Sequence, residues 1–318
     1  MFNMQKATRL ERLDRDMLNY KHIIWYITGH CKFKCTYCDV VDNKRPNTDL
    51  ESQKKIVDIL FELKENFEIY LYGGEPTEYI YLHDILKYIS KKDSKYFKGI
   101  ELQTNLNVSI EEFKKIVSYK CITKIAPSIH ITFLKGDTLD ELVEKILIIE
   151  KNSKLNRIDF MLEKWFIDKH VEFNKKMINA KLGDYIQYVY NFFEHHTGKP
   201  YTGKWNADHV TEYKEMIDAN AYEQERYKIF YEDKKTEELS INEMLLKNLS
   251  FKGRTCEARK FLVWVDFNGD WWECNISQAK NKPLGNLLKN PKHFLHTSNY
   301  PIKCRTEKCD ACFFVKRY

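Results

Sequence analysis

The sequence lacks the long apolar runs that mark membrane-spanning and exported proteins. No stretch approaches the ~20 apolar residues of a membrane-spanning helix. Residues 5–13 are charged throughout, so the apolar region of a signal peptide is missing there. Blocks of like charge, low-complexity tracts and fixed-period repeats are missing too. These absences predict a cytoplasmic protein with no membrane partner.

A strong excess of one charge is also absent. The net charge is +6 over 318 residues, and acidic and basic residues are interspersed. This pattern is typical of a solvated, lysine-rich surface and argues against a nucleic-acid partner, since no RNA-binding module accompanies it. Hydrophobic residues make up 43% of the chain, enough for a sizeable core, and the length suggests about two domains.

Cysteine, by contrast, is plentiful. Nine cysteines without an export signal indicate a reducing compartment and metal ligation instead of disulfides. Three of them form a CxxxCxxC motif, Cys31, Cys35 and Cys38, directly after a β-branched apolar run at 23–28 that is typical of a strand. Three thiolates cannot complete four-coordinate zinc, but they can hold three irons of a 4Fe–4S cluster and leave the fourth iron open.

The chain alternates between strand and helix signals across residues 22–193. Capping boxes at Thr48, Ser109 and Thr138 open three of the helices. Six β/α units predict a parallel sheet and are too few for a closed eight-stranded barrel, so we expect an open six-stranded (β/α)6 partial TIM barrel of the α/β class. The expected strands cover 23–28, 68–72, 100–103, 122–131 (with Pro127 as an interruption), 156–162 and 185–192, and the expected helices 48–64, 82–89, 109–119, 138–151 and 168–180.

A second motif stands at the end of the second expected strand: Gly73, Gly74, Glu75 and Pro76. With CxxxCxxC, in which aromatic Tyr37 precedes the third cysteine, it resembles the radical S-adenosylmethionine (SAM) superfamily. The resemblance implies a 4Fe–4S cluster on the three cysteines whose open iron is chelated by SAM. It also implies a 5′-deoxyadenosyl radical that takes a hydrogen atom from substrate.

The same resemblance assigns further cofactor-binding residues. It implies that the glycine backbones approach the methionine amino group of SAM, that Glu75 places negative charge beside it, and that Tyr37 lies near the adenine. Similar segments in relatives contact SAM through residues that match Gln103, Thr104 and Asn105. Many relatives carry Ser-x-Asp at the end of the fourth strand, where Ser128 matches and His130 departs.

Three residues are candidates for acid/base chemistry at the strand ends. His130 replaces a carboxylate by an imidazole, Glu163 follows the fifth strand, and His195 (with His196) follows the sixth. The alternative for each is a solvated loop residue.

The C-terminal residues 256–318 hold five more cysteines. Twelve residues separate Cys256 from Gly269 and four separate Gly269 from Cys274, and an Asn-Gly turn between apolar runs predicts a β-hairpin there. With Cys304, Cys309 and Cys312, this resembles the twitch domain, the shorter relative of the SPASM domain, which houses one auxiliary 4Fe–4S cluster. The expected ligands are Cys256, Cys274, Cys309 and Cys312, with Cys304 spare or substituting; a four-cysteine zinc site is the alternative.

The expected organisation has four parts. An N-terminal extension at 1–21 precedes the radical SAM barrel at 22–193, a helical bridge or insertion follows at 194–255, and the twitch domain takes 256–318. Within the bridge we expect one helix over about 211–232 and another opening at Ser240.

The expected function is that of a radical SAM oxidoreductase or maturase with a second cluster for electron transfer. Its substrate would be a small molecule or a peptide, and its reductant a flavodoxin or ferredoxin. Because the first expected strand begins near residue 22, no leader-binding domain fits before it, which favours a small molecule or a peptide delivered otherwise. The alternatives are a non-catalytic iron–sulfur or zinc-binding protein and an RNA-modifying radical SAM enzyme.

Overall fold

The structure is a computed structural model of the chain. It describes residues 7–12, 20–35, 38, 49–133, 139–162, 167–190, 226–231, 233–240, 252–253, 255–256, 258–274, 282–297 and 302–304. Across these ranges, no helix is both long enough and apolar enough to span a bilayer.

A nine-stranded sheet forms the frame of the molecule, in the order β13-β12-β11-β2-β3-β4-β5-β6-β7. Strands β2 to β7 pair in parallel along the chain, as the strand–helix alternation predicts. Their bounds are Lys21–Thr28, Phe67–Gly73, Phe97–Thr104, Ile122–Ile129, Ile158–Leu162 and Ile186–Tyr190. Pro127 lies inside β5 without ending it.

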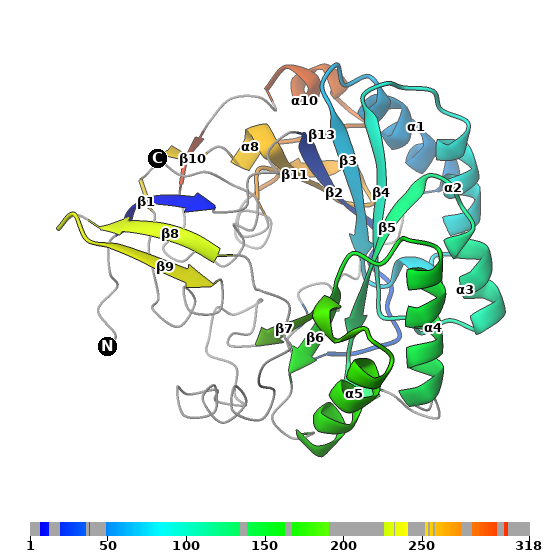
Figure 1. Cartoon of the computed structure of the whole chain (residues 1–318). Coiled ribbons are helices and arrows are strands. Elements are labelled where there is room, and N and C mark those ends of the chain that lie inside the picture. The colour runs from blue at the N-terminus through cyan, green and yellow to red at the C-terminus, as the bar shows by residue number, and fades with distance from the viewer. Residues whose placement is uncertain are drawn as a thin grey trace.

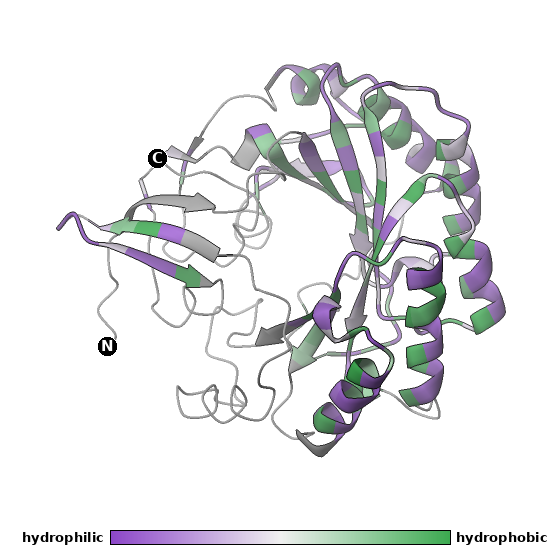
Figure 2. Cartoon of the chain, in the orientation of Figure 1, coloured by the Kyte–Doolittle hydropathy of each residue, from purple (hydrophilic) through white to green (hydrophobic). Residues whose placement is uncertain are grey.

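Helices cover one face of this sheet and leave the other face concave (Figure 1). They are α1 (Leu50–Phe61), α2 (Leu82–Ser90), α3 (Ile110–Val117), α4 (Leu139–Lys151) and α5 (Ile167–Asn179). Asp49, and not Thr48, caps α1 by accepting from the Ser52 N–H at 2.9 Å, whereas Ser109 caps α3 as its capping box predicts. In Figure 2 these helices turn polar residues outward and apolar residues toward the sheet.

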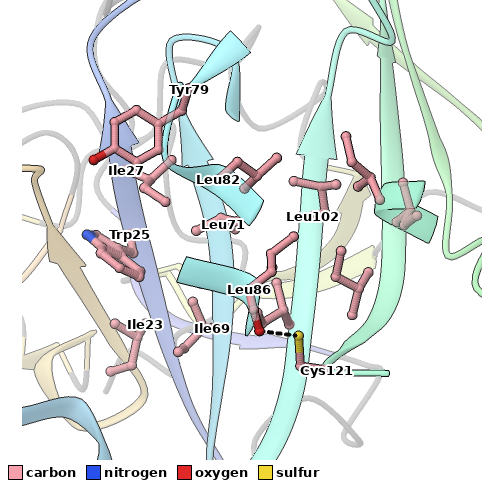
Figure 3. Packing of buried hydrophobic residues seen from close by; sticks show 14 of the residues in the cluster. Ile23, Trp25, Ile27, Ile69, Leu71, Tyr79, Leu82, Leu86, Leu102 and Cys121 are labelled. Atoms are coloured by element: carbon pink, nitrogen blue, oxygen red, sulfur yellow. Dashed lines mark hydrogen bonds between the residues drawn. The ribbon is translucent and has the colours of Figure 1, made fainter. Parts of the chain in front are cut away.

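The hydrophobic core lies between the sheet and the helices. Alternate strand residues such as Trp25, Leu71 and Leu102 point into it and are fully buried (Figure 3). Burial of each such side chain stabilises the fold by roughly 1.5–3 kcal/mol. Cys121 belongs to this layer, and its thiol lies 3.6 Å from the Leu86 carbonyl.

The other alternate residues put charge on the concave face. Glu68 accepts from Lys124 at 2.8 Å. Arg157 reaches Glu101 at 2.5 Å and Asp159 at 3.0 Å. The carboxylates are buried and the two cations are half-buried, and the pairs Glu68–Lys124 and Glu101–Arg157 each reach past one intervening strand, so they link strands on the side away from the helices.

The C-terminal hairpin differs from expectation in its position. The turn forms as predicted: Asp266 Oδ1 accepts from the N–H groups of Asn268 and Asp270, both at 2.9 Å, and Gly269 has φ +80°. However, β11 (Leu262–Val265) pairs in parallel with β2, and β12 (Asp270–Trp272) and β13 (Gly285–Asn286) follow outward. The sheet is therefore wider than six strands, because β11 covers the edge of β2 that six strands would leave open.

The helical bridge predicted at 194–255 is wrong where the structure describes it. Residues 226–231 and 236–240 are the antiparallel strands β8 (Arg226–Tyr231) and β9 (Thr236–Ser240), so the helix predicted over about 211–232 is not formed at 226–231. Ile229 is buried between the half-buried Lys228 and Phe230, and Leu239 is buried next to the exposed Glu238, a pattern that fits the period of two of a strand. The predicted helical residues 211–225 and 241–250 lie outside the described residues.

The N-terminal extension also contributes to this small sheet. Strand β1 (Ala7–Arg12) pairs antiparallel with β8, which gives the order β1-β8-β9. The three strands lie on the side of the main sheet opposite to helices α1–α5 (Figure 1). The described part of the chain also contains short elements: helices α8 (Ala258–Phe261) and α10 (Pro291–Thr297), paired strands β10 (Thr255–Cys256) and β14 (Ile302–Lys303), and 3-10 turns at Pro76–Glu78, Ile131–Phe133 and Gly183–Tyr185.

Candidate functional site

The carboxyl ends of β2, β3, β4 and β5 bring most of the predicted site residues to one edge of the sheet. The loop after β2 carries the three cysteines, and the loop after β3 carries Glu75. Thr104 ends β4 and Asn105 follows it, while Ser128 is the second-last residue of β5. Parallel barrels place their active sites at this edge. The structure therefore brings together motifs that lie up to about 100 residues apart in the sequence.

The glycine loop docks directly on the cysteine loop. The Gly74 N–H donates to the Thr28 carbonyl at 2.8 Å, and the Glu75 N–H donates to the His30 carbonyl at 2.7 Å. A Cβ on Gly73 would lie 2.4 Å from the Thr28 oxygen, and a Cβ on Gly74 would lie 2.0 Å from the His30 oxygen. The contact that requires glycine at both positions is thus backbone of this chain, which the sequence interpretation did not foresee.

Glu75 fastens three segments of the site to one another. Its buried carboxylate accepts from the Thr77 N–H and hydroxyl at 3.0 and 2.6 Å, from the Thr104 hydroxyl at 2.7 Å, and from the Asn105 N–H at 2.7 Å. The pKa of Glu75 is raised overall, because the effect of burial is larger than that of these donors, which lower it. A carboxylate with this many internal donors holds the ends of β3 and β4 in register beside the cysteines.

Glu78 has a similar role that the sequence analysis missed. One carboxylate oxygen accepts from the Lys32 N–H at 3.0 Å and lies 3.5 Å from His30 Nε2, while the other accepts from Asn107 Nδ2 at 3.1 Å. It therefore attaches both residues that flank Cys31 to the 3-10 turn that Pro76 begins. Glu78 lies two residues after the GGEP motif and belongs to no sequence motif itself, so its role is visible only from its tertiary contacts.

Two cysteine sulfurs have polar side chains directed at them. Asn105 Nδ2 donates to Cys31 Sγ at 3.8 Å, and His130 Nδ1 lies 3.6 Å from Cys35 Sγ. Burial, followed by the charges of Glu75 and Glu78, raises the pKa of the Cys31 thiol to about 12. Near neutral pH this thiol therefore carries its proton, and a metal ion that binds the sulfur must displace that proton.

The three cysteines after β2 are a donor set for iron. The Cys38 N–H donates to the Cys35 carbonyl at 3.1 Å. Thiolates are the usual ligands of iron–sulfur clusters, and in a 4Fe–4S cluster each thiolate binds a different iron. Three thiols therefore suit a cluster in which one iron keeps an open position, whereas a four-coordinate zinc site would need a further ligand. By the chemistry of their donor atoms, the residues present fit such a cluster.

The remaining predicted residues divide between structured and undescribed positions. Gln103 Nε2 donates to Asp159 at 3.1 Å, next to the Arg157 ion pair. Both ring nitrogens of His130 have partners in the chain, since Nε2 lies 2.9 Å from Ser128 Oγ, so neither points free toward a substrate. Outside the described residues lie Tyr37, Glu163, His195, His196, Cys309 and Cys312.

The C-terminal cysteines are partly described. Cys256 lies in β10 opposite Ile302 of β14, and Cys304 follows that strand directly, its carbonyl accepting from the Gly253 N–H at 2.8 Å. Cys274 lies two residues beyond the end of β12. The β10–β14 pair therefore places the backbone of Cys304 near that of Cys256, which sequence spacing treats as distant.

Comparison with solved structures finds the same fold. The chain matches anSMEcpe with bound AdoMet and a peptide at a TM-score of 0.58 and 17% identity, over 87% of this chain and 81% of the other. It matches Streptococcus suis SuiB bound to the precursor peptide SuiA at a TM-score of 0.54 and 16% identity, over 86% of this chain and 64% of SuiB. The chain thus spans less than two thirds of SuiB.

Comparison of sequences finds a partial relative and a family. An uncharacterized protein of Methanocaldococcus jannaschii is 28% identical over 142 residues, which are 44% of this chain and 46% of that protein, so the match spans about half of the relative. The family model of the radical SAM superfamily matches residues 25–189, slightly more than half of the chain. The chain therefore belongs to the radical SAM superfamily, and membership implies an enzyme that uses SAM and a 4Fe–4S cluster.

Proposed function

We propose that the chain holds a 4Fe–4S cluster on Cys31, Cys35 and Cys38 and binds SAM at the carboxyl ends of β3, β4 and β5. The observation that carries the proposal is the docking of the Gly73–Glu75 loop on the cysteine loop through two backbone hydrogen bonds. It makes the two family motifs one rigid unit. When bound, the cluster and SAM supply a 5′-deoxyadenosyl radical that removes a hydrogen atom from substrate.

The protein's own residues supply position and shelter. Glu75 and Glu78 fix the loops through hydrogen bonds to Asn105 and Lys32, so the thiols are held before any cofactor arrives. Polar groups at the ends of β4 and β5, namely Gln103, Thr104, Asn105 and Ser128, line the edge where SAM would lie. Tyr37 at the adenine remains part of the proposal.

The substrate is proposed to be a peptide or a small molecule, and the reaction that of an oxidoreductase or maturase. Support for a peptide comes from the shared fold with SuiB and anSMEcpe, both of which have solved structures with a bound peptide. The likeness is at 16–17% identity and therefore concerns the fold. A flavodoxin or ferredoxin is the proposed reductant.

A second, auxiliary cluster is proposed at the C-terminal cysteines. Its ligands would be Cys256, Cys274, Cys309 and Cys312, and the β10–β14 pairing supports Cys304 as a replacement for one of them. Four protein ligands would close this cluster, so it would transfer electrons instead of binding substrate.

Iron analysis after anaerobic reconstitution tests both sites. We expect about eight irons in the native protein and about half of that when Cys31, Cys35 and Cys38 are all changed to Ala. Cys121→Ala is the matched control, because Cys121 is a buried thiol hydrogen-bonded to Ser90 and Leu86 far from this edge of the sheet, and it should lose no iron. Full iron in the triple variant overturns the first site; about four irons plus one zinc in the native protein overturns the second cluster.

A further inference from the structure

His130 lies where a cluster ligand and a strand end meet. It follows β5 directly, and its ring makes an edge-on contact with Phe33 of the cysteine loop at a centroid distance of 6.1 Å. Phe33 in turn stacks on Phe133 at 5.0 Å, so aromatic rings enclose the space between the cysteine loop and β5. Within that space His130 Nδ1 lies 3.6 Å from Cys35 Sγ, and its Nε2 lies 2.9 Å from Ser128 Oγ.

The chemistry of the two partners decides which ring nitrogen carries the proton. A cysteine that binds iron is a thiolate, and a thiolate only accepts hydrogen bonds. Nδ1 must therefore be the donor to Cys35. A neutral imidazole then has a lone pair on Nε2, which accepts from the Ser128 hydroxyl, a group able to donate.

We propose that His130 is a positioning residue that donates a hydrogen bond from Nδ1 to the cluster ligand Cys35, with Ser128 holding the imidazole in the required tautomer. The inference rests on the proposed cluster at Cys31, Cys35 and Cys38. Hydrogen bonds to cluster sulfurs favour the reduced state, because reduction adds negative charge to the ligands. His130 therefore makes the cluster easier to reduce, in place of the acid/base role that its chemistry alone suggests.

Four variants separate this bond from a general loss of packing. The amide nitrogen of Asn lies where Nδ1 of the imidazole lies, so His130→Asn keeps a donor to Cys35. The amide nitrogen of Gln lies where Nε2 lies, so His130→Gln loses that donor. His130→Leu loses it as well. His170→Leu is the matched control, because His170 is a buried imidazole away from the cysteines, located in α5 against Phe160.

The measurement is the midpoint potential of the cluster, followed by EPR during a dithionite titration without SAM or substrate. In His130→Leu and His130→Gln we expect about a tenfold lower ratio of reduced to oxidised cluster at a fixed potential, which is about 59 mV for one electron. His130→Asn and His170→Leu should keep the native midpoint. A native midpoint in His130→Leu, or a midpoint in His130→Asn as low as in His130→Leu, overturns the proposal.

A measurement on the native protein covers the case in which a variant fails to bind iron. Pulsed EPR of the reduced cluster, with all histidines labelled with ¹⁵N, should show a nitrogen coupling, and this coupling should persist in Cys121→Ala. No nitrogen coupling in fully loaded native protein overturns the inference while leaving the cluster in place. Failure of the proposed function has a different signature, namely unchanged iron after removal of Cys31, Cys35 and Cys38.

Discussion

Gly74→Ala should remove the iron site, because the added methyl group has no space between the two loops. Its Cβ would lie 2.0 Å from the His30 oxygen and 2.4 Å from the His30 carbonyl carbon, whereas real contacts of this kind exceed 3.0 Å. The obstacle is backbone, which cannot rotate away as a side chain can. The glycine loop and the cysteine loop must therefore separate by roughly 1 Å.

The cost follows from the contacts that such a separation breaks. The hydrogen bonds from Gly74 N–H to Thr28 and from Glu75 N–H to His30, at 2.8 and 2.7 Å, would both stretch beyond hydrogen-bond range. Two such bonds contribute about 2 kcal/mol and overpacking costs about 1–3 kcal/mol, so the free energy of unfolding should fall by about 3–5 kcal/mol. Because His30 precedes Cys31, the first thiol moves with it.

Chemical denaturation of the apoprotein and iron analysis after reconstitution check the two consequences. Gly99→Ala is the control. Gly99 lies in β4 with φ +127°, and its Cβ would clash with the Thr123 side chain, away from the cysteines. It should destabilise the fold and still bind iron. Suppose instead that Gly74→Ala keeps native stability and full iron but loses SAM affinity. Glycine would then be required at this position for SAM binding, and the contact between the two loops would not require it.

Three further outcomes follow from the described contacts and the motifs. Glu75→Gln should lower the free energy of unfolding by about 1–3 kcal/mol in urea titrations. The reason is that either orientation of the new amide turns its NH₂ group toward a backbone N–H, that of Asn105 or that of Thr77. An unchanged free energy of unfolding would refute the role of Glu75 in holding the loops together. Burial lowers the pKa of His170 to about 4 from the ordinary 6.5. The neutral, buried His170 therefore stabilises the fold fully above about pH 6.5, and this stability is lost as the pH falls toward 4, by up to about 3 kcal/mol. In His170→Leu, this pH-dependent loss should be missing from a plot of the free energy of unfolding against pH. Changing Cys309 and Cys312 together to Ala should leave SAM cleavage without substrate intact and stop substrate turnover; normal product formation would make the auxiliary site structural.

The sequence by itself determined the family and most of the parallel sheet. CxxxCxxC and GGEP are local patterns whose chemistry depends on residue type and spacing, and both were placed correctly at the ends of β2 and β3. The strands between residues 21 and 190 were equally readable, because continuous apolar runs bounded by capped helices are a local signal. The β11–β12 turn was predictable for the same reason, since Asn268-Gly269 favours a hairpin wherever it lies.

Only the tertiary structure decided which segments meet. Pairing of β11 with β2, and of β1 with β8, joins residues more than 200 positions apart, and no local periodicity encodes such a partner. The helix predicted over about 211–232 is wrong at 226–231, because short antiparallel strands carry weak local signals and depend on the partner strand for their hydrogen bonds. The reason for glycine at position 74, the fastening role of Glu78, and the bond between His130 and Cys35 are likewise properties of distances between loops. Such distances exist only after the sheet has brought the strand ends together.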